Sequence, residues 1–159
     1  MTARCLLLIL FLSAAPAFSQ AHPGCPMRPT SLAAMRRCYR PLLVFSPSPR
    51  DPRLRRQQSA LDSAADDMMD RFVLLVPFAP TLRGYNPPLD APYALLPSAQ
   101  VADARQRFHV PADTFTVILL GEDGTEKLRS DKPVSVQRLN ALIDSMPTRR
   151  IERQRPHAN

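Results

Sequence analysis

The sequence contains little glycine: 4 glycines stand against 18 prolines among 159 residues. This balance indicates stiff connections between elements rather than flexible linkers. The chain has no glycine-rich loop of the kind that cradles phosphates, and no spacing of histidine, cysteine and acidic residues matches a zinc or calcium site. We therefore expect neither a nucleotide-phosphate site nor a metal or other cofactor.

Cysteine is also scarce, and its three copies form no Cys-x-x-Cys pair. Many dithiol oxidoreductases use such a pair, so its absence argues against dithiol oxidoreductase chemistry. A serine hydrolase is disfavoured as well, because the chain has only three histidines and two of them lie in expected loose ends. The sequence predicts no catalytic residues.

No apolar run reaches the roughly 20 residues that a membrane-spanning helix needs. The run from Cys5 to Ala15 is shorter, follows the positive charge of Arg4, and is followed by Pro16 and small residues. This pattern predicts a cleaved signal peptide over residues 1–20. An uncleaved anchor and a lipoprotein attached at Cys25 are weaker alternatives. We expect a secreted or periplasmic protein without a stable membrane anchor.

Positive charge exceeds negative charge, with a formal net charge of +7 that loses one unit if Arg4 is removed. The arginines are spread along the chain rather than clustered, so we do not expect nucleic-acid binding. The charge indicates either an ordinary solvated basic surface or weak attraction to anionic polymers. The expected partner is an unidentified protein or an anionic envelope or extracellular polymer.

Cys25 and Cys38 remain after signal cleavage, and an oxidising compartment makes a disulfide between them possible. The closed loop would stabilise the fold by about 3 kcal/mol in the chain-entropy model. A short helix expected between Thr30 and Tyr39 argues against the bridge, because it would hold the two cysteines apart. A disulfide and two inert thiols are both compatible with the sequence.

The first half of the domain alternates strand, helix and strand. Short apolar runs at 42–46 and 72–78 have the length and composition of buried strands. Between them, Asp51 and Pro52 form a strong helix start, and one apolar stripe then follows helical spacing: Leu54, Leu61, Ala65, Met68 and Phe72. Three acidic residues, Asp66, Asp67 and Asp70, are expected on the solvated face of this helix.

The second half begins with a proline-rich stretch at 79–97, which is either an ordered loop or an insertion. A helix at 98–108, strands at 115–120 and 125–129 joined by a Gly-Glu-Asp-Gly turn, and a last helix at 136–146 ended by Pro147 follow. This order predicts an α/β, thioredoxin-like fold with a mixed sheet of about four strands flanked by helices. We expect an irregular lead-in at 21–34, the domain at 35–152 and a disordered tail at 153–159.

Several segments resemble the domain-of-unknown-function 4174 family: 42–47 (LLVFSP), 51–57 (DPRLRRQ), 115–129 and 143–150 (IDSMPTRR). Similar domains occur in secreted matrix proteins of the sushi-repeat-containing group. The resemblance covers about residues 35–152 and implies a thioredoxin-like fold of peroxiredoxin flavour, without supplying catalytic residues. Two departures are Glu122, where a lysine is expected, and the long loop at 79–97.

Thioredoxin-type chemistry needs a thiolate at the start of the first long helix, where the helix dipole lowers its pKa. Here the segment from Ser46 to Arg53 contains no sulfur. The free amides of that helix start favour an anion, unless Asp51 already occupies them as the cap. We predict a binding face that combines this segment with the tyrosines of the 79–97 loop: Ser46, Ser48, Arg50, Asp51, Arg53, Tyr85 and Tyr93.

The predicted function is therefore a thioredoxin-like binding or accessory module without redox cysteines in the usual position. The alternative is an enzyme of unrecognised chemistry related to oxidative or thiol stress, which rests on fold analogy.

Overall fold

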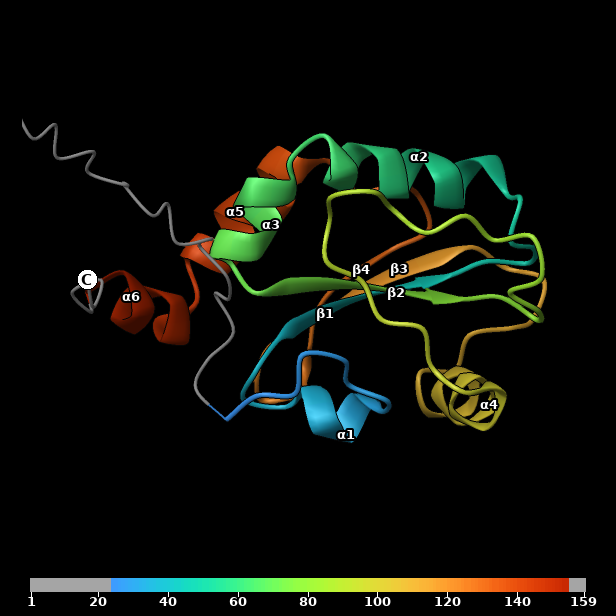
Figure 1. Cartoon of the computed structure of the whole chain (residues 1–159), viewed down its shortest axis with the longest axis horizontal. Coiled ribbons are helices and arrows are strands. Elements are labelled where there is room, and N and C mark those ends of the chain that lie inside the picture. The colour runs from blue at the N-terminus through green and yellow to red at the C-terminus, as the bar shows by residue number, and fades with distance from the viewer. Residues whose placement is uncertain (1–23, 155–159) are drawn as a thin grey trace, which may run out of the picture.

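The computed structural model describes residues 24–154, so the expected signal peptide and the end of the expected tail lie outside the described residues. Ten elements follow one another along this part of the chain (Figure 1). In order they are α1 (Leu32–Met35), β1 (Arg40–Phe45), α2 (Pro52–Asp62), α3 (Ala65–Asp70), β2 (Val73–Phe78), α4 (Ser98–Arg107), β3 (Thr116–Leu120), β4 (Glu126–Ser130), α5 (Val136–Asp144) and α6 (Pro147–Gln154).

The four strands form one mixed sheet in the order β2-β1-β3-β4. Strands β1 and β2 are parallel, whereas β3 is antiparallel to both β1 and β4. The sheet confirms the predicted fold class, including the parallel first pair. The unit of β2, α4 and β3 adds no further parallel strand. After α4 the chain lies on the other side of β1, and β3 runs antiparallel to β1.

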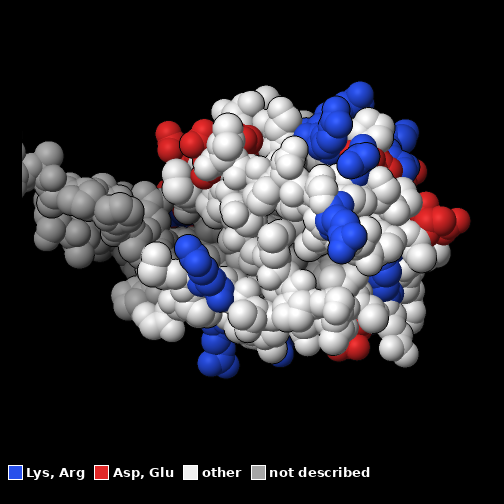
Figure 2. All heavy atoms as spheres, turned by 45° about the vertical axis from the view of Figure 1, so that its right-hand side comes forward, with Lys and Arg blue, Asp and Glu red and all other residues white. Residues whose placement is uncertain are grey.

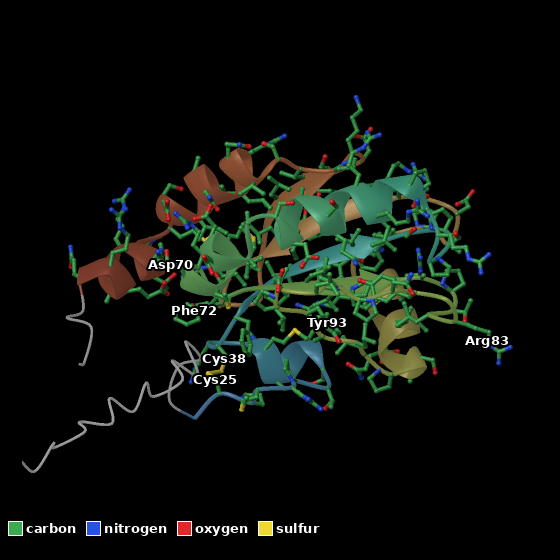
Figure 3. The ribbon with its side chains drawn as sticks, turned by 45° about the horizontal axis from the view of Figure 1, so that its top comes forward. Cys25, Cys38, Asp70, Phe72, Arg83 and Tyr93 are labelled. Atoms are coloured by element: carbon green, nitrogen blue, oxygen red, sulfur yellow. A yellow bond between two sulfur atoms is a disulfide. The ribbon has the colours of Figure 1, made fainter. Side chains whose placement is uncertain are left out.

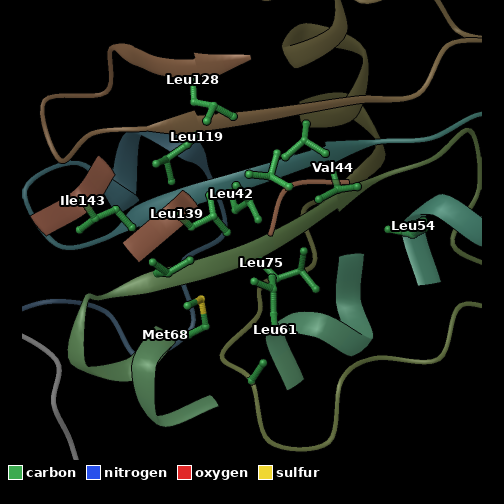
Figure 4. Packing of buried hydrophobic residues seen from close by; sticks show 14 of the residues in the cluster. Leu42, Val44, Leu54, Leu61, Met68, Leu75, Leu119, Leu128, Leu139 and Ile143 are labelled. Carbon is green, nitrogen blue, oxygen red and sulfur yellow. The ribbon is translucent and has the colours of Figure 1, made fainter. Parts of the chain in front are cut away.

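Helices cover both faces of the sheet. Figure 1 shows α2, α3 and α5 on one side and α1 and α4 on the other. Successive residues of a strand point to opposite faces, so Leu42 and Val44 of β1 pack beneath α2 and α5, while Leu43 and Phe45 pack toward α4. Figure 4 shows the first of these two cores. Strands buried on both faces explain the continuous apolar runs in the sequence.

The helix predicted near residues 52–70 is two helices, with a break at Ser63 and Ala64. Leu54, Leu61 and Met68 still face the same core, which is why one stripe fitted all three. The prediction was wrong for Phe72: its backbone adopts a left-handed conformation (φ 53°) as the chain enters β2, and its side chain packs toward the other core.

The break also changes the place of the acidic residues. Asp66 and Asp67 lie in the first turn of α3, where a carboxylate suits the helix dipole. Asp67 and Asp70 were expected on a solvated face, but both also bind other side chains. Asp67 accepts hydrogen bonds from Asn140 and from Arg71, and Asp70 forms an ion pair with Arg149.

Pro147 begins a helix instead of only ending one. Proline fits the first position of a helix because its missing N–H is not needed there, and α6 continues from Pro147 to Gln154. Its Arg149 side chain is 7% exposed and bonds Asp70 of α3 and Asp144 of α5. Its Glu152 pairs with Arg40 of β1 at 2.6 Å. Ion pairs therefore attach the last helix to α3 and α5, and one buried ion pair attaches it to the sheet.

Helix α1 is shorter than the predicted helix over 30–39. It ends at Met35, and Arg37 then takes a left-handed conformation (φ 64°) that turns the chain back. This turn places Cys38 beside Cys25, with Cα atoms 5.7 Å apart, and the two form a disulfide. The obstacle that the sequence presented, a helix separating the cysteines, is therefore absent.

Candidate functional site

The loop between β1 and α2 is held by its own serines. Ser46 is fully buried, its backbone N–H donates to the carbonyl of Phe78, and its Oγ donates to the carbonyl of Ser48 at 2.7 Å. Ser48 Oγ in turn accepts from the amide of Arg50. Ser46 consequently shapes the loop and does not belong to its exposed surface, contrary to its place in the predicted binding face.

Asp51 caps helix α2 and is almost completely buried. Its Oδ1 accepts from the Arg53 amide at 2.8 Å, and its two oxygens accept from the Arg53 guanidinium at 3.0 and 2.7 Å. These bonds from Arg53 hold the pKa of Asp51 below its usual range although burial opposes them. The Arg53 guanidinium also lies over the Phe115 ring, 4.9 Å from its centroid. Asp51 thus occupies the helix start that could otherwise bind an anion.

A polar pocket of about 560 Å³ lies beside this loop. We call it the α2 pocket, because one wall is the outer face of α2 and the opposite wall is the loop at 84–86. It is lined by Pro49, Arg50, Arg55, Gln58, Ser59, Asp62, Gly84, Tyr85 and Asn86. The structure therefore brings together the two segments that the sequence predicted to share a binding face.

Arginines without carboxylate partners surround the α2 pocket. Arg50 and Arg55 line it and are exposed, and Arg56 and Arg83 are exposed nearby in the sequence. Within residues 24–154 none of these four forms an ion pair, in contrast to Arg53, which is neutralised by Asp51. Figure 2 shows lysine and arginine side chains gathered over the end of the molecule where α2 begins, and Figure 3 shows Arg83 projecting outward there.

Gly84 allows the turn of the loop beside Arg50. It adopts a left-handed conformation (φ 77°) that side-chain-bearing residues rarely take, and the position of its missing Cβ is 3.5 Å from Arg50 Nη2.

Hydrogen bonds from α2 hold the loop in place. Gln58 Nε2 donates to the Asn86 carbonyl at 2.8 Å. At the far end, the Asp62 carboxylate accepts from the amides of residues 89–91 at 2.8–3.1 Å. These bonds, of which that from Ala91 has the largest effect, lower the pKa of Asp62.

Tyr85 forms part of the pocket and packs against the core on the α2 side of the sheet. Its hydroxyl is buried and has no hydrogen-bond partner among the described residues. Burial raises the pKa of Tyr85, so the phenol remains a neutral donor at physiological pH. An unsatisfied buried hydroxyl is costly.

Tyr93 lies elsewhere, although it belongs to the same loop. It forms a parallel bridge with Leu75 at the outer edge of β2 and is 41% exposed. It borders a second, mostly apolar groove of about 710 Å³, whose walls include Met27, Tyr39, Met69, Phe72 and Leu95. Tyr93 therefore lines the second groove, whereas Arg50 and Tyr85 line the α2 pocket.

The disulfide lies near this second groove and away from the α2 pocket. Figure 3 shows Cys25 and Cys38 on the Phe72 side of the molecule and Arg83 at the other end. Both cysteines are partly buried, and the Tyr39 hydroxyl donates to the Pro26 carbonyl at 2.7 Å, which fastens the same segment. The sulfur atoms are therefore not at the start of α2.

Within residues 24–154, no three histidine, cysteine or acidic side chains are arranged to hold a metal ion. No helix in this range is long and apolar enough to span a membrane.

Sequence reasoning missed the α2 wall of the pocket. Arg55, Gln58, Ser59 and Asp62 follow one another at i, i+3, i+4 and i+7, which is the spacing of one helix face. The sequence shows this polar stripe opposite the apolar stripe of the helix. The stripe does not predict a pocket, because solvated helix faces have the same pattern and only the path of the 79–91 loop makes this face a pocket wall.

The fold is shared with peroxiredoxins. Plasmodium yoelii thioredoxin peroxidase I superimposes with a TM-score of 0.55 at 18% identity, covering 80% of this chain and 84% of that one. The reduced 2-Cys peroxiredoxin of Plasmodium vivax gives 0.55 at 17% identity, covering 76% and 84%. No curated protein matches the sequence. At these identities the likeness concerns the fold alone.

One family model matches most of the chain. The model described as "Domain of unknown function (DUF4174)" matches residues 31–152, which include the β1–α2 loop, the α2 pocket and α6 as far as Glu152. This range agrees with the resemblance found in the sequence. The chain therefore belongs to the DUF4174 family and has a thioredoxin-like fold.

Proposed function

We propose that this protein is a non-catalytic binding module built on a thioredoxin-like fold, with the α2 pocket and its surrounding arginines as the binding face. The proposal rests on one observation at the start of α2, where a carboxylate stands in place of a thiolate. A capping carboxylate, paired with Arg53, occupies the place where a thiolate would be activated. Arginines beside it that form no ion pair within residues 24–154 leave the neighbouring surface attractive to an anionic partner.

We further propose that the module acts outside the cytoplasm. The predicted signal peptide and the disulfide both suit an oxidising compartment. The partner is an anionic surface, either on a protein or on an envelope or extracellular polymer.

Capture from the native envelope or medium tests the binding role. The wild-type protein should retain a specific partner, and Arg50→Ser should reduce its recovery severalfold, since a charge-assisted hydrogen bond contributes about 1.5–3 kcal/mol. Arg150→Ser is the matched control, because Arg150 is exposed on α6 at the opposite end of the molecule. Equal recovery by all three proteins would contradict the proposed binding face.

A second candidate is thiol-based enzymology, and one observation favours it. The Cys25–Cys38 disulfide is partly buried and not fully enclosed beside an apolar groove, and accessible disulfides are more easily attacked by thiolates than buried ones. We expect the purified protein to neither reduce insulin disulfides nor consume peroxide with a thiol donor. Turnover that disappears in Cys25→Ser or Cys38→Ser would establish this candidate in place of the first.

A further inference from the structure

We propose that the α2 pocket binds an acidic sugar unit of an anionic polysaccharide, that is, a sugar ring bearing one carboxylate or sulfate group. The inference rests on the proposed binding function and names the partner of the same site. It follows from the particular combination of charged and neutral groups in the pocket.

The cationic end of the pocket supplies two guanidinium groups. Arg50 enters from the β1–α2 loop and Arg55 from the first half of α2, and neither has an ion-pair partner within residues 24–154. A guanidinium presents a planar set of donors that matches the oxygens of a carboxylate or sulfate. Two of them on neighbouring segments provide a site for one anionic group.

The remaining lining is neutral and rich in unused hydrogen-bonding capacity. Gln58 uses its Nε2 on the Asn86 carbonyl, which leaves its carbonyl oxygen as an acceptor. The exposed Ser59 hydroxyl makes no hydrogen bond within residues 24–154. Several donors and acceptors close together suit a ligand with several hydroxyl groups.

Asp62 limits the ligand to one anionic group. Its carboxylate lies on the same pocket and accepts three backbone amides, so that it remains ionised with little unused acceptor capacity. A second anion at this end would be repelled, whereas a hydroxyl could donate to the remaining lone pair. A pocket with arginines at one end and a carboxylate at the other favours an acidic sugar over an acidic peptide, because the acidic side chains of a peptide carry carboxylates without adjoining hydroxyls.

The size of the pocket is compatible with this ligand. Its volume of about 560 Å³ lies within the ordinary range for small-molecule sites. The outlying Arg56 and Arg83 add long-range attraction for a charged polymer.

Isothermal titration with defined hexasaccharides tests the inference. Probes are a hyaluronan fragment (carboxylate only), a chondroitin sulfate fragment (carboxylate and sulfate), cellohexaose (neutral) and hexaglutamate. We expect binding of one or both acidic sugars, with the better one identifying the preferred anion. Neutral cellohexaose and hexaglutamate should bind at least about tenfold more weakly, which corresponds to the loss of one charge-assisted contact.

Three variants and a control locate the binding. Arg50→Gln and Arg55→Gln should each weaken acidic-sugar binding about tenfold, and Ser59→Leu should weaken it similarly by filling the pocket without changing charge. Arg150→Gln, with the same charge change on α6, should stay within about twofold. All four positions are exposed, and thermal unfolding checks that each variant is folded.

Two outcomes would overturn the inference separately from the proposed function. If Arg150→Gln weakens binding as much as Arg50→Gln, or Ser59→Leu has no effect, attraction is only general and the pocket holds no sugar. If hexaglutamate binds as tightly as the sugars and depends on Arg50 and Arg55, the partner is an acidic protein and the binding face still stands. If neither partner capture nor any probe responds to Arg50, both proposals fail.

Discussion

At the scale of single residues, Asp51 determines what the start of α2 can do. It caps the helix, is 7% exposed and pairs with Arg53. We predict that Asp51→Ala lowers the free energy of unfolding by about 1–2 kcal/mol, because it removes an N-cap and leaves Arg53 without its carboxylate. Asp51→Asn should cost less, since an asparagine oxygen still caps the helix. Urea denaturation measures both values.

Asp131→Ala serves as the control for this comparison, because Asp131 is exposed in a turn and should change stability by less than about 0.5 kcal/mol. If Asp51→Ala were no more destabilising than the control, the cap would not be what holds the loop.

A second residue-scale prediction concerns the attachment of α6. Arg40 is fully buried and pairs with Glu152, and it also contacts Glu122 at 3.3 Å. Without Glu152 the buried Arg40 keeps only Glu122 as a carboxylate partner, and Arg149 also loses an ion-pair partner; loss of one partner from a buried ion pair is costly. We predict that Glu152→Ala costs about 3 kcal/mol of unfolding free energy, measured by chemical denaturation.

Glu126→Ala is the matched comparison, because Glu126 forms a surface pair with Arg129 and such pairs contribute at most about 1 kcal/mol. Equal effects of the two substitutions would show that α6 is not held by Arg40.

At the scale of elements, the strands and the helices α4 and α5 were predicted within one or two residues, whereas the ends of α1 and α2 and the start of α6 were not. Strand positions follow from continuous apolar runs with turns on both sides, which are local signals. The break between α2 and α3, the end of α1 at Met35 and the start of α6 at Pro147 depend on tertiary contacts: Arg37 turning the chain and Arg149 bonding Asp70. Such contacts pair residues far apart in sequence and leave no periodic pattern.

The disulfide ties the segment before α1 to the chain that enters β1. We predict that the double variant Cys25→Ser/Cys38→Ser loses about 3 kcal/mol of unfolding free energy in the chain-entropy model, with an unchanged circular dichroism spectrum because neither cysteine lies in a regular element. Intact mass should rise by about two hydrogens on reduction of the wild-type protein. An unchanged mass would rule out the bridge.

The β3–β4 turn makes a contribution that depends on pH. Although burial opposes ionisation, hydrogen bonds from Lys127 and Thr125 lower the pKa of Asp123 to about 2. Because the folded-state pKa lies below the unfolded value of about 3.9, this stabilisation is complete above pH 4 and is lost as the pH falls toward 2. Between pH 4 and 2, Asp123→Asn should lose less of its unfolding free energy than the wild type does. Parallel pH profiles would exclude this role.

At the scale of the whole molecule, the fold class followed from the order of elements, but the site followed only in part. Arg50 and Tyr85 were predicted to share a face and do line one pocket. Ser46 is buried, and Tyr93 lies at the edge of β2. The path of the irregular loop at 79–97 decides these positions, and no periodicity encodes it. The wall from Arg55 to Asp62 gains its role from that same loop.

The central claim is that this thioredoxin-like domain binds through the α2 pocket and not through its sulfur atoms. The most direct measurement is an amide NMR titration of the ¹⁵N-labelled protein with the acidic hexasaccharide that binds more tightly. The account predicts that the largest shifts occur in residues 49–62 and 82–91, with none near Cys25 and Cys38. Shifts concentrated around the disulfide and the β2 groove, or no shifts at all, would contradict it.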